Sequence, residues 1–204
     1  MHLVPTQDEV IQLLQSTGAL REGHFLYKNG MHSNQYLQVP LAFRYYQHAK
    51  TLSVALSRLV RANPELRAVL PELSIVTPAT GGLPVAFGVC EALRAKQVYW
   101  AERDNENQAL RFRQFLEQHR GEKVLLVDDI LRTGQKLTEL KSLIEANGAE
   151  VVGLAVIVYQ PSPDTPDFSP IPFYYLAKLE SMYFSEGPIC DLAHHDAEPV
   201  KVWI

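Results

Sequence analysis

The chain lacks several features that would place it in a specialised class of protein. It has only two cysteines, Cys90 and Cys190, which are too few for a disulfide framework, so we expect reduced thiols. Its longest apolar run, Val151–Val158 with one glycine, is far too short to cross a bilayer. Residues Met1–Glu9 lack the basic start and apolar stretch of a signal peptide. We therefore expect a cytoplasmic protein with no membrane partner.

The sequence also lacks an excess of positive charge. Lys and Arg number 19 against 23 Asp and Glu, and no basic arm or stripe stands out. Proteins that bind nucleic acid usually concentrate positive charge because they neutralise phosphates, so we expect no nucleic-acid partner. The 204 residues, 47% of them hydrophobic, suit a single domain spanning 1–204 with a sizeable core.

The most informative segment that is present runs from Val124 to Lys136. Four apolar residues, 124–127, lead directly into Asp128 and Asp129, and a short polar turn then opens a helical pattern. Such an apolar run is typical of a strand buried on both faces, so the turn should lie at the carboxyl end of a parallel strand, where open α/β sheets bind ligands. Backbone N–H groups in such a turn favour a phosphate, and two carboxylates can accept hydrogen bonds from sugar hydroxyls. The pattern therefore predicts a sugar-phosphate site.

Helical and strand patterns alternate along most of the chain. We expect helices from the capping box at Thr6 to Gly18 and at 45–61, 82–95 and 138–146, with strands at 73–76, 98–101, 124–127 and 151–159. Residues 24–39 indicate two short strands around a turn at 28–30, and the five prolines of 161–172 indicate a long surface loop. The repeated strand–helix order predicts an α/β fold with a parallel sheet flanked by helices.

Four blocks of this sequence together resemble the type I phosphoribosyltransferases, and most of all the orotate phosphoribosyltransferases. Gly23–Tyr36 is similar to the family's base-binding segment, and Thr77–Pro84 is similar to its pyrophosphate loop. Ala101–Arg103 matches the start of its mobile loop, and Asp128–Lys136 matches its signature for phosphoribosyl diphosphate (PRPP). The blocks occur in family order, which makes the resemblance fairly specific. It implies the type I fold with a small hood from about 20–40 and 173–204.

The resemblance also implies a reaction and a set of site residues. The reaction is transfer of ribose 5-phosphate from PRPP to a pyrimidine base, with orotate expected, and release of pyrophosphate. Asp128 and Asp129 would be the catalytic pair that holds the ribose hydroxyls. Other PRPP-binding residues would be Arg132, Thr133, Gly134, Gln135, Lys136, Thr80, Gly81 and Arg103, and the base-binding residues would be Lys28, Tyr36 and Arg132. The implied cofactor is Mg²⁺, held through PRPP and not directly by protein ligands, and the implied assembly is a homodimer.

Each of these positions also has a simpler interpretation. The acidic pair could belong to a solvated turn, and Gly81–Gly82 could merely start a helix. Lys28 could be exposed and idle, and Arg103 could pair with a neighbouring acid on the surface, which contributes little. His194–Asp196 with Cys190 suggests metal ligands, but adjacent histidines point apart on most backbones, so we expect no metal site there.

Three departures from the family pattern leave the acceptor and the activity open. The phosphate turn has Arg132 and Lys136 where small or hydroxyl residues are usual. The segment between Asp104 and Leu110 has no lysine, although the family's mobile loop normally supplies one. Gln160 stands after the last long strand, where one branch reads orotate with an Asp-Arg pair. Two alternatives follow: a PRPP-dependent transferase for another nucleobase, and a non-catalytic homologue that binds PRPP or a nucleotide.

Overall fold

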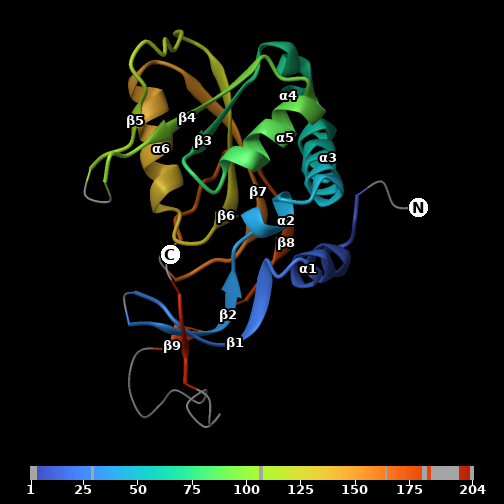
Figure 1. The fold of residues 1–204 in the computed structure, drawn as a ribbon. Coiled ribbons are helices and arrows are strands. Elements are labelled where there is room, and N and C mark those ends of the chain that lie inside the picture. The colour runs from blue at the N-terminus through green and yellow to red at the C-terminus, as the bar shows by residue number, and fades with distance from the viewer. Residues whose placement is uncertain are drawn as a thin grey trace.

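A central sheet and a smaller sheet organise the molecule (Figure 1). The computed structural model describes residues 4–28, 30–105, 108–163, 165–180, 183–184 and 198–202. In this part of the chain the central sheet has six strands in the order β5-β4-β3-β6-β7-β8, and all neighbours are parallel except the β4–β5 pair. These strands are β3 (Ser74–Pro78), β4 (Gln97–Glu102), β5 (Arg111–Phe112), β6 (Lys123–Leu131), β7 (Glu150–Tyr159) and β8 (Phe173–Lys178).

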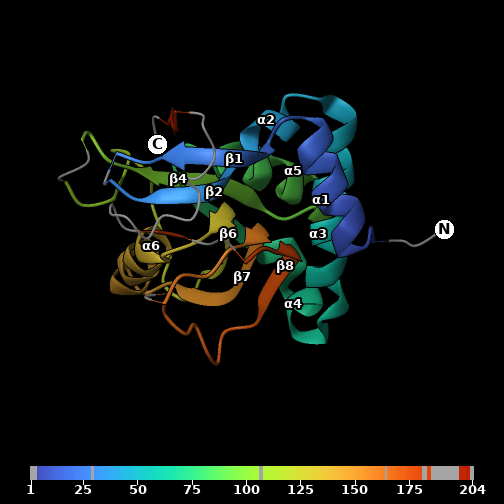
Figure 2. The same ribbon diagram turned by 90° about the horizontal axis from the view of Figure 1, so that it is seen from below.

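Helices cover both faces of the central sheet (Figure 2). The described helices are α1 (Gln7–Ser16), α2 (Pro40–Phe43), α3 (Tyr46–Ala62), α4 (Pro64–Val69), the 3-10 turn Leu70–Glu72, α5 (Leu83–Leu93) and α6 (Gln135–Ala146). Helices α3 and α5 pack on one face and α6 packs on the other. This arrangement confirms the predicted α/β fold with a parallel sheet flanked by helices. No helix in the described ranges is both long and apolar enough to cross a membrane.

The apolar run of β6 is buried on both faces, as its sequence predicts. Leu125 and Val127 belong to the core cluster that contains α3 and α5, whereas Val124 and Leu126 belong to the cluster that contains α6. All four side chains are fully buried. Because each buried aliphatic side chain contributes about 1.5–3 kcal/mol, the end of β6 is fixed firmly in the sheet.

The smaller sheet, which we call the hood, has the order β10-β1-β2-β9. Its strands are β1 (Leu20–Leu26), β2 (His32–Leu37), β9 (Tyr183–Phe184) and β10 (Val200–Lys201). The expected hood included residues 173–204, but residues 173–178 form β8, which pairs with β7 at the edge of the central sheet. Leu176 and Ala177 of β8 are buried there, and this burial keeps residues 173–178 out of the hood.

Several element boundaries differ from those expected. Strand β6 continues through the acidic pair, with Asp128 opposite Val156, because β7 provides partners up to Tyr159. Helix α6 begins at Gln135, three residues earlier than its apolar pattern indicates. The capping box of α1 is present: the Thr6 hydroxyl accepts from Glu9 N–H and the Glu9 carboxylate accepts from Thr6 N–H.

Candidate active site

The two predicted phosphate loops meet at the topological switch point of the central sheet. From β3 the chain passes through α5 to β4 on one side, while β6 lies on the other side of β3. Open α/β sheets bind ligands in the crevice at the carboxyl ends of such a strand pair. Residues 79–82 follow β3 and residues 132–134 follow β6, so both loops border this crevice. Figure 1 shows the hood on the side of the sheet where the turn between β6 and α6 lies.

The acidic pair lies directly against the paired glycines of the first loop. A Cβ added to Gly81 would be 2.8 Å from Asp129 Oδ2, and one added to Gly82 would be 2.6 Å from Asp128 Oδ1. Backbone N–H groups hold both carboxylates: Asp129 N donates to Asp128 Oδ1 and Ile130 N donates to Asp129 Oδ1, each at 2.9 Å. The structure thus brings together two motifs that are far apart in the sequence. Only residues without a Cβ allow this close approach.

The acidic pair is electrostatically unfavourable in the protein alone. Burial raises the pKa of Asp128 well above its usual range, and the neighbouring Asp129 charge raises it further. Burial also raises the pKa of Asp129. The positive charge of Lys136 acts in the opposite direction on the pKa of both carboxyls. Hydroxyl donors or a cation at this position would relieve the penalty, because either favours the ionised carboxylates.

The turn between β6 and α6 exposes backbone donors. Gly134 adopts the left-handed conformation, with φ +71°, and immediately precedes α6. No side chain of the described residues caps α6, so its first N–H groups are available to an anion. The side chains of Thr133, Gln135 and Lys136 are exposed around the turn. Thr80 is likewise exposed beside Gly81 in the first loop.

Arg132 connects the phosphate turn to the hood. Its Nε donates to Gln160 Oε1 at 2.9 Å, and its guanidinium lies 5.7 Å from the centre of the Tyr27 ring. Tyr27 in turn lies 6.3 Å from Tyr36, measured between ring centres. Burial raises the pKa of Tyr36, and the charge of Arg132 acts against that shift. Two of the predicted base-binding residues, Arg132 and Tyr36, therefore lie near each other.

Two residues that were not among the predicted base-binding residues, Tyr27 and Gln160, also belong to this group. Tyr27 precedes Lys28, the third predicted base-binding residue, which is exposed in the hairpin turn. Gln160 is almost fully buried, with 1% exposure, and its backbone N–H donates to Leu131 O. Only a weak sequence signal points to Gln160: one branch of the family has an Asp-Arg pair at this position, and this chain does not.

Arg103 contacts α6 in this structure. Its guanidinium forms an ion pair with Glu139, and its Nη1 donates to Gln108 O at 3.0 Å. The Glu139 carboxylate also accepts from Leu110 N–H. The partner is thus an acid of α6 and not one of the sequence neighbours of Arg103, since Glu102 pairs with Arg113 and Asp104 with Arg111.

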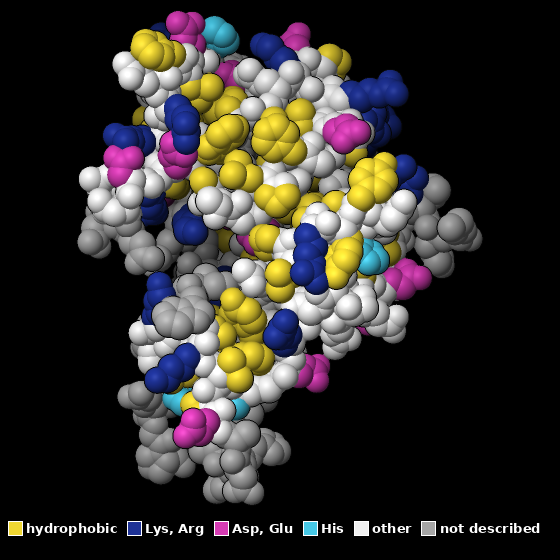
Figure 3. Space-filling model, viewed as in Figure 1, with side chains coloured by type: hydrophobic (Ala, Val, Ile, Leu, Met, Phe, Trp, Pro, Cys, Tyr) yellow, Lys and Arg dark blue, Asp and Glu magenta, His cyan; other side chains and the backbone are white. Residues whose placement is uncertain are grey.

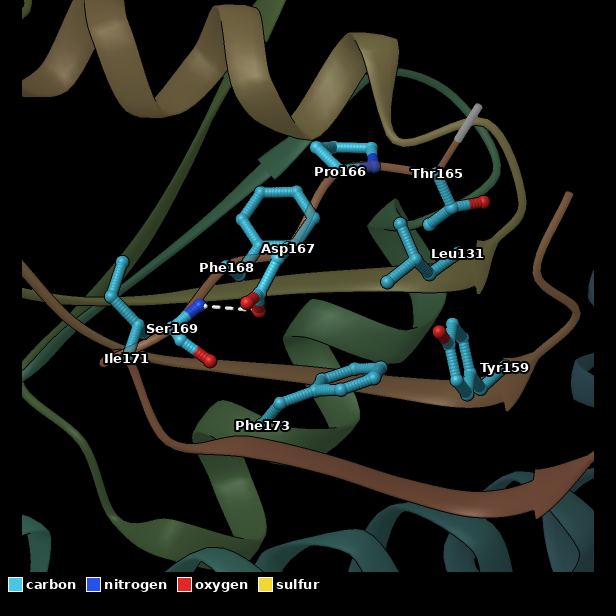
Figure 4. A pocket seen from close by; sticks show the side chains of 9 residues that line it. All are labelled: Leu131, Tyr159, Thr165, Pro166, Asp167, Phe168, Ser169, Ile171 and Phe173. Carbon is cyan, nitrogen blue, oxygen red and sulfur yellow. Dashed lines mark hydrogen bonds between the residues drawn. The ribbon is translucent and has the colours of Figure 1, made fainter. Parts of the chain in front are cut away.

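The proline-rich loop covers the back of the phosphate turn. The Thr165 hydroxyl donates to Arg132 O, and Pro166 packs against Gly134. Behind this contact is a cavity of about 340 Å³, whose lining includes three aromatic rings (Figure 4). These rings belong to Tyr159, Phe168 and Phe173. The loop thus supports the turn from the side opposite the crevice.

The described residues offer no ready-made metal cage. Among them, no group of three or more His, Cys, Asp or Glu side chains could hold a metal ion. The segment His194–Asp196 and Cys190, considered above as possible ligands, lie outside the described residues. The acidic pair is therefore the strongest candidate for contact with a cation, and it would need further oxygen ligands from a substrate.

Comparisons with known proteins agree with this geometry. A family model for the phosphoribosyl transferase domain matches residues 47–173. The orotate phosphoribosyltransferase of Thermotoga maritima is 32% identical over 181 residues, which are 88% of this chain and 90% of that protein. The enzyme of the same name from Acidithiobacillus ferrooxidans is 34% identical over 197 residues, or 96% of each chain.

Structural comparison supports the same fold. The crystal structure of orotate phosphoribosyltransferase from Aeropyrum pernix has a TM-score of 0.66 at 19% identity, covering 83% of this chain and 93% of that one. We conclude that this chain belongs to the phosphoribosyltransferase family and, within it, to the orotate phosphoribosyltransferases.

Proposed function

We propose that this protein transfers ribose 5-phosphate from PRPP to orotate, forming orotidine monophosphate and releasing pyrophosphate in pyrimidine nucleotide synthesis. The observation that carries the proposal is the contact between the acidic pair and Gly81–Gly82 at the switch point. The acidic pair suits the hydroxyls of a ribose, and the glycine loop suits a pyrophosphate. A sugar that carries both groups fits the whole crevice.

The reaction requires positioned groups more than covalent help. A ring nitrogen of the base attacks C1 of the ribose and releases its N–H proton to solvent, and the C1–oxygen bond breaks so that pyrophosphate leaves with the electron pair. The transition state has oxocarbenium character, as in glycoside cleavage. Asp128 and Asp129 would accept hydrogen bonds from the ribose hydroxyls, and their negative charge would stabilise the developing positive charge. Hydroxyl donation favours their ionised state, which burial otherwise disfavours.

Backbone donors would bind the two ends of PRPP. The free N–H groups at the start of α6, with Thr133, Gln135 and Lys136 around them, would bind the 5-phosphate. The residues before α5, Thr80 and Gly81, would face the pyrophosphate, because α5 also begins without a side-chain cap in the described residues. Arg103 would reach pyrophosphate only by exchanging its ion pair with Glu139 for one with the substrate.

The base would lie between the phosphate turn and the hood. Arg132 and Tyr36 already approach each other there, and Lys28 lies in the hairpin turn next to Tyr27. The Arg132 guanidinium would supply charge-assisted hydrogen bonds to an anionic base such as orotate. Gln160 orients that guanidinium through its side-chain oxygen. Gln160 would thus act on the base indirectly, through Arg132, where one branch of the family has a charged residue.

Mg²⁺ fits this site as an ion held through the substrate. The crevice offers two carboxylates, whereas Mg²⁺ prefers octahedral oxygen coordination and usually keeps waters and phosphate ligands. When bound with PRPP, the ion would neutralise charge on the leaving pyrophosphate.

A test of the proposal is pyrophosphate release from PRPP and Mg²⁺ with a panel of bases. Release with orotate alone is expected. Release with a different base would point to another acceptor, and PRPP binding without release would point to a non-catalytic homologue. The variant Asp129→Asn should lose activity while Asp8→Asn, at an exposed acid of α1, keeps it. Full activity of Asp129→Asn would contradict the assigned role of the pair.

We also propose a homodimer. Large hydrophobic side chains are exposed on the face that carries α5, where Figure 3 shows a gathering of hydrophobic residues. Phe87 is 52% exposed and lies 6.3 Å from Trp100, measured between ring centres, and Tyr46 is 71% exposed. An apolar surface of this kind often marks an interface. Light scattering should give twice the chain mass, and Phe87→Glu should give a monomer.

A further inference from the structure

A second cavity, remote from the switch-point crevice, lies beside the carboxyl-terminal ends of α3 and α5. It has a volume of about 370 Å³, within the range of small-molecule sites. Its lining residues are Val54, Ser57, Arg58, Arg61, Ala92 and Arg94. Helix α5 has 11 residues and begins after Gly82, so its far end is about 16 Å from the glycine loop. The cavity therefore does not share lining residues with the proposed PRPP site.

The lining of this cavity is strongly positive. Half of its residues are arginines and none is acidic, although the whole chain has a formal net charge of −4. Figure 3 shows Lys and Arg side chains gathered where α3 and α5 end. Within the described ranges, neither Arg61 nor Arg94 forms an ion pair with an acid.

The cavity is partly preorganised. Arg61 Nη2 donates to Leu93 O at 2.9 Å and to Ala92 O at 3.3 Å, and these bonds hold its guanidinium at the end of α5. The Ser57 hydroxyl, which is buried, donates to Ser53 O at 2.7 Å. A guanidinium that is already held in place loses less freedom when a ligand binds.

Arg94 occupies a backbone position that normally selects glycine. It ends α5 in the left-handed conformation, with φ 54° and ψ 44°. Helices commonly end this way on Gly or Asn, because other residues meet a steric penalty of about 1–2 kcal/mol. An arginine at this position keeps that penalty and adds a third positive charge to the cavity. Strained positions of this kind are found at ligand sites more often than elsewhere.

We propose that this cavity is a second anion site, which binds the polyphosphate group of a small phosphorylated molecule. Three guanidinium groups match a ligand with several negative charges, and the planar fork of arginine pairs with phosphate oxygens in a bidentate manner. A surface cavity of this volume on a chain of net negative charge suits a small molecule. A nucleic acid would need an extended positive surface.

Calorimetric titration with sodium tripolyphosphate tests the site. The double variant Arg58→Gln, Arg94→Gln should bind about tenfold more weakly or worse, because two charge-assisted contacts are removed. The matched control is Arg67→Gln, at an exposed arginine of α4 outside the lining, and it should bind as the unaltered protein does. Arg61 is left intact because it caps α5. Thermal unfolding of each variant checks that the fold is retained.

Amide NMR shifts during the same titration locate the anion. Shifts centred on residues 57–61 and 92–95 are expected. Shifts confined to 79–82 and 132–138, or unchanged affinity in the double variant, would overturn the proposal because the anion would then occupy the PRPP crevice. A parallel titration with ATP distinguishes the possible ligands. Tighter binding of ATP than of tripolyphosphate identifies a nucleotide as the ligand, and equal affinities show that the site recognises the polyphosphate group alone.

Discussion

Replacing Gly134 by alanine would measure how much the phosphate turn depends on the proline-rich loop. Gly134 has φ +71°, and an added Cβ would lie 2.7 Å from Pro166 Cδ and 2.9 Å from Pro166 Cγ. Gly121 provides a matched control, since it has φ +75° and nothing within 4 Å of an added Cβ. The two positions therefore share the backbone strain and differ in the clash.

The expected loss of stability has two parts. The left-handed conformation costs an alanine about 1–2 kcal/mol relative to glycine, so Gly121→Ala should lower the free energy of unfolding by that amount. Overpacking adds about 1–3 kcal/mol, so Gly134→Ala should lower it by about 2–5 kcal/mol in total. Because the turn must shift to relieve the clash, the KM for PRPP should also rise in Gly134→Ala and stay unchanged in Gly121→Ala.

The test is urea unfolding and initial-rate kinetics. It uses the two glycine variants, Pro166→Ala, and the double variant Gly134→Ala, Pro166→Ala. The double variant should recover the overpacking part, because alanine at 166 has neither Cγ nor Cδ. If Gly134→Ala and Gly121→Ala lose the same stability within about 0.5 kcal/mol, the contact with Pro166 does not constrain the turn and the reasoning is refuted.

Three further predictions concern the crevice itself. Asp128→Asn should abolish transfer yet raise the free energy of unfolding at pH 7. Folding raises the pKa of the Asp128 carboxyl, so this group destabilises the protein as pH rises from its unfolded pKa of about 3.9 through its folded pKa. Urea unfolding below pH 3.9, about the unfolded pKa, should therefore show no stability difference between the variant and the unaltered protein. Gly82→Ala would place a Cβ 2.1 Å from Thr77 Oγ1 and should lower kcat/KM by about a hundredfold by displacing the acidic pair, whereas an unchanged kcat/KM would show that the loop yields without moving it. Arg132→Met should raise the KM for the base by roughly tenfold or more with little change in the KM for PRPP, and an equal rise in both constants would count against a base-side role for the guanidinium.

Much of the fold follows from local patterns. The uninterrupted apolar run of β6 and the capping box at Thr6 depend only on near neighbours, and both were predicted correctly. The end of β6 was predicted wrongly, because Asp128 is held in the strand by pairing with Val156, which is distant in sequence. The position of β8 was missed for a similar reason: its apolar residues could cover either sheet, and only the free edge of β7 decides.

The candidate site likewise contains residues that local motifs predict and residues that only the tertiary structure brings together. The acidic pair and Gly81 could be singled out because each is part of a compact motif with its own physical logic. The approach of Tyr27 and Gln160 to Arg132 could not, because it depends on how the hood is placed over the central sheet. Arg103 shows the limit most plainly, since its partner Glu139 lies 36 residues further along the chain, beyond strands β5 and β6.

Arg132 has a further consequence for how acceptor preference can change. Its carbonyl oxygen is bonded to Thr165, while its side chain reaches Gln160 and the Tyr27 ring. The same amino acid is therefore anchored through its main chain to the proline-rich loop behind the proposed phosphate turn, and through its side chain to residues around the proposed base site. If Arg132 has the proposed role, a substitution at 160 that changes the preferred nucleobase would also shift the proposed phosphate turn, and we expect new specificity to need paired changes at 160 and 165.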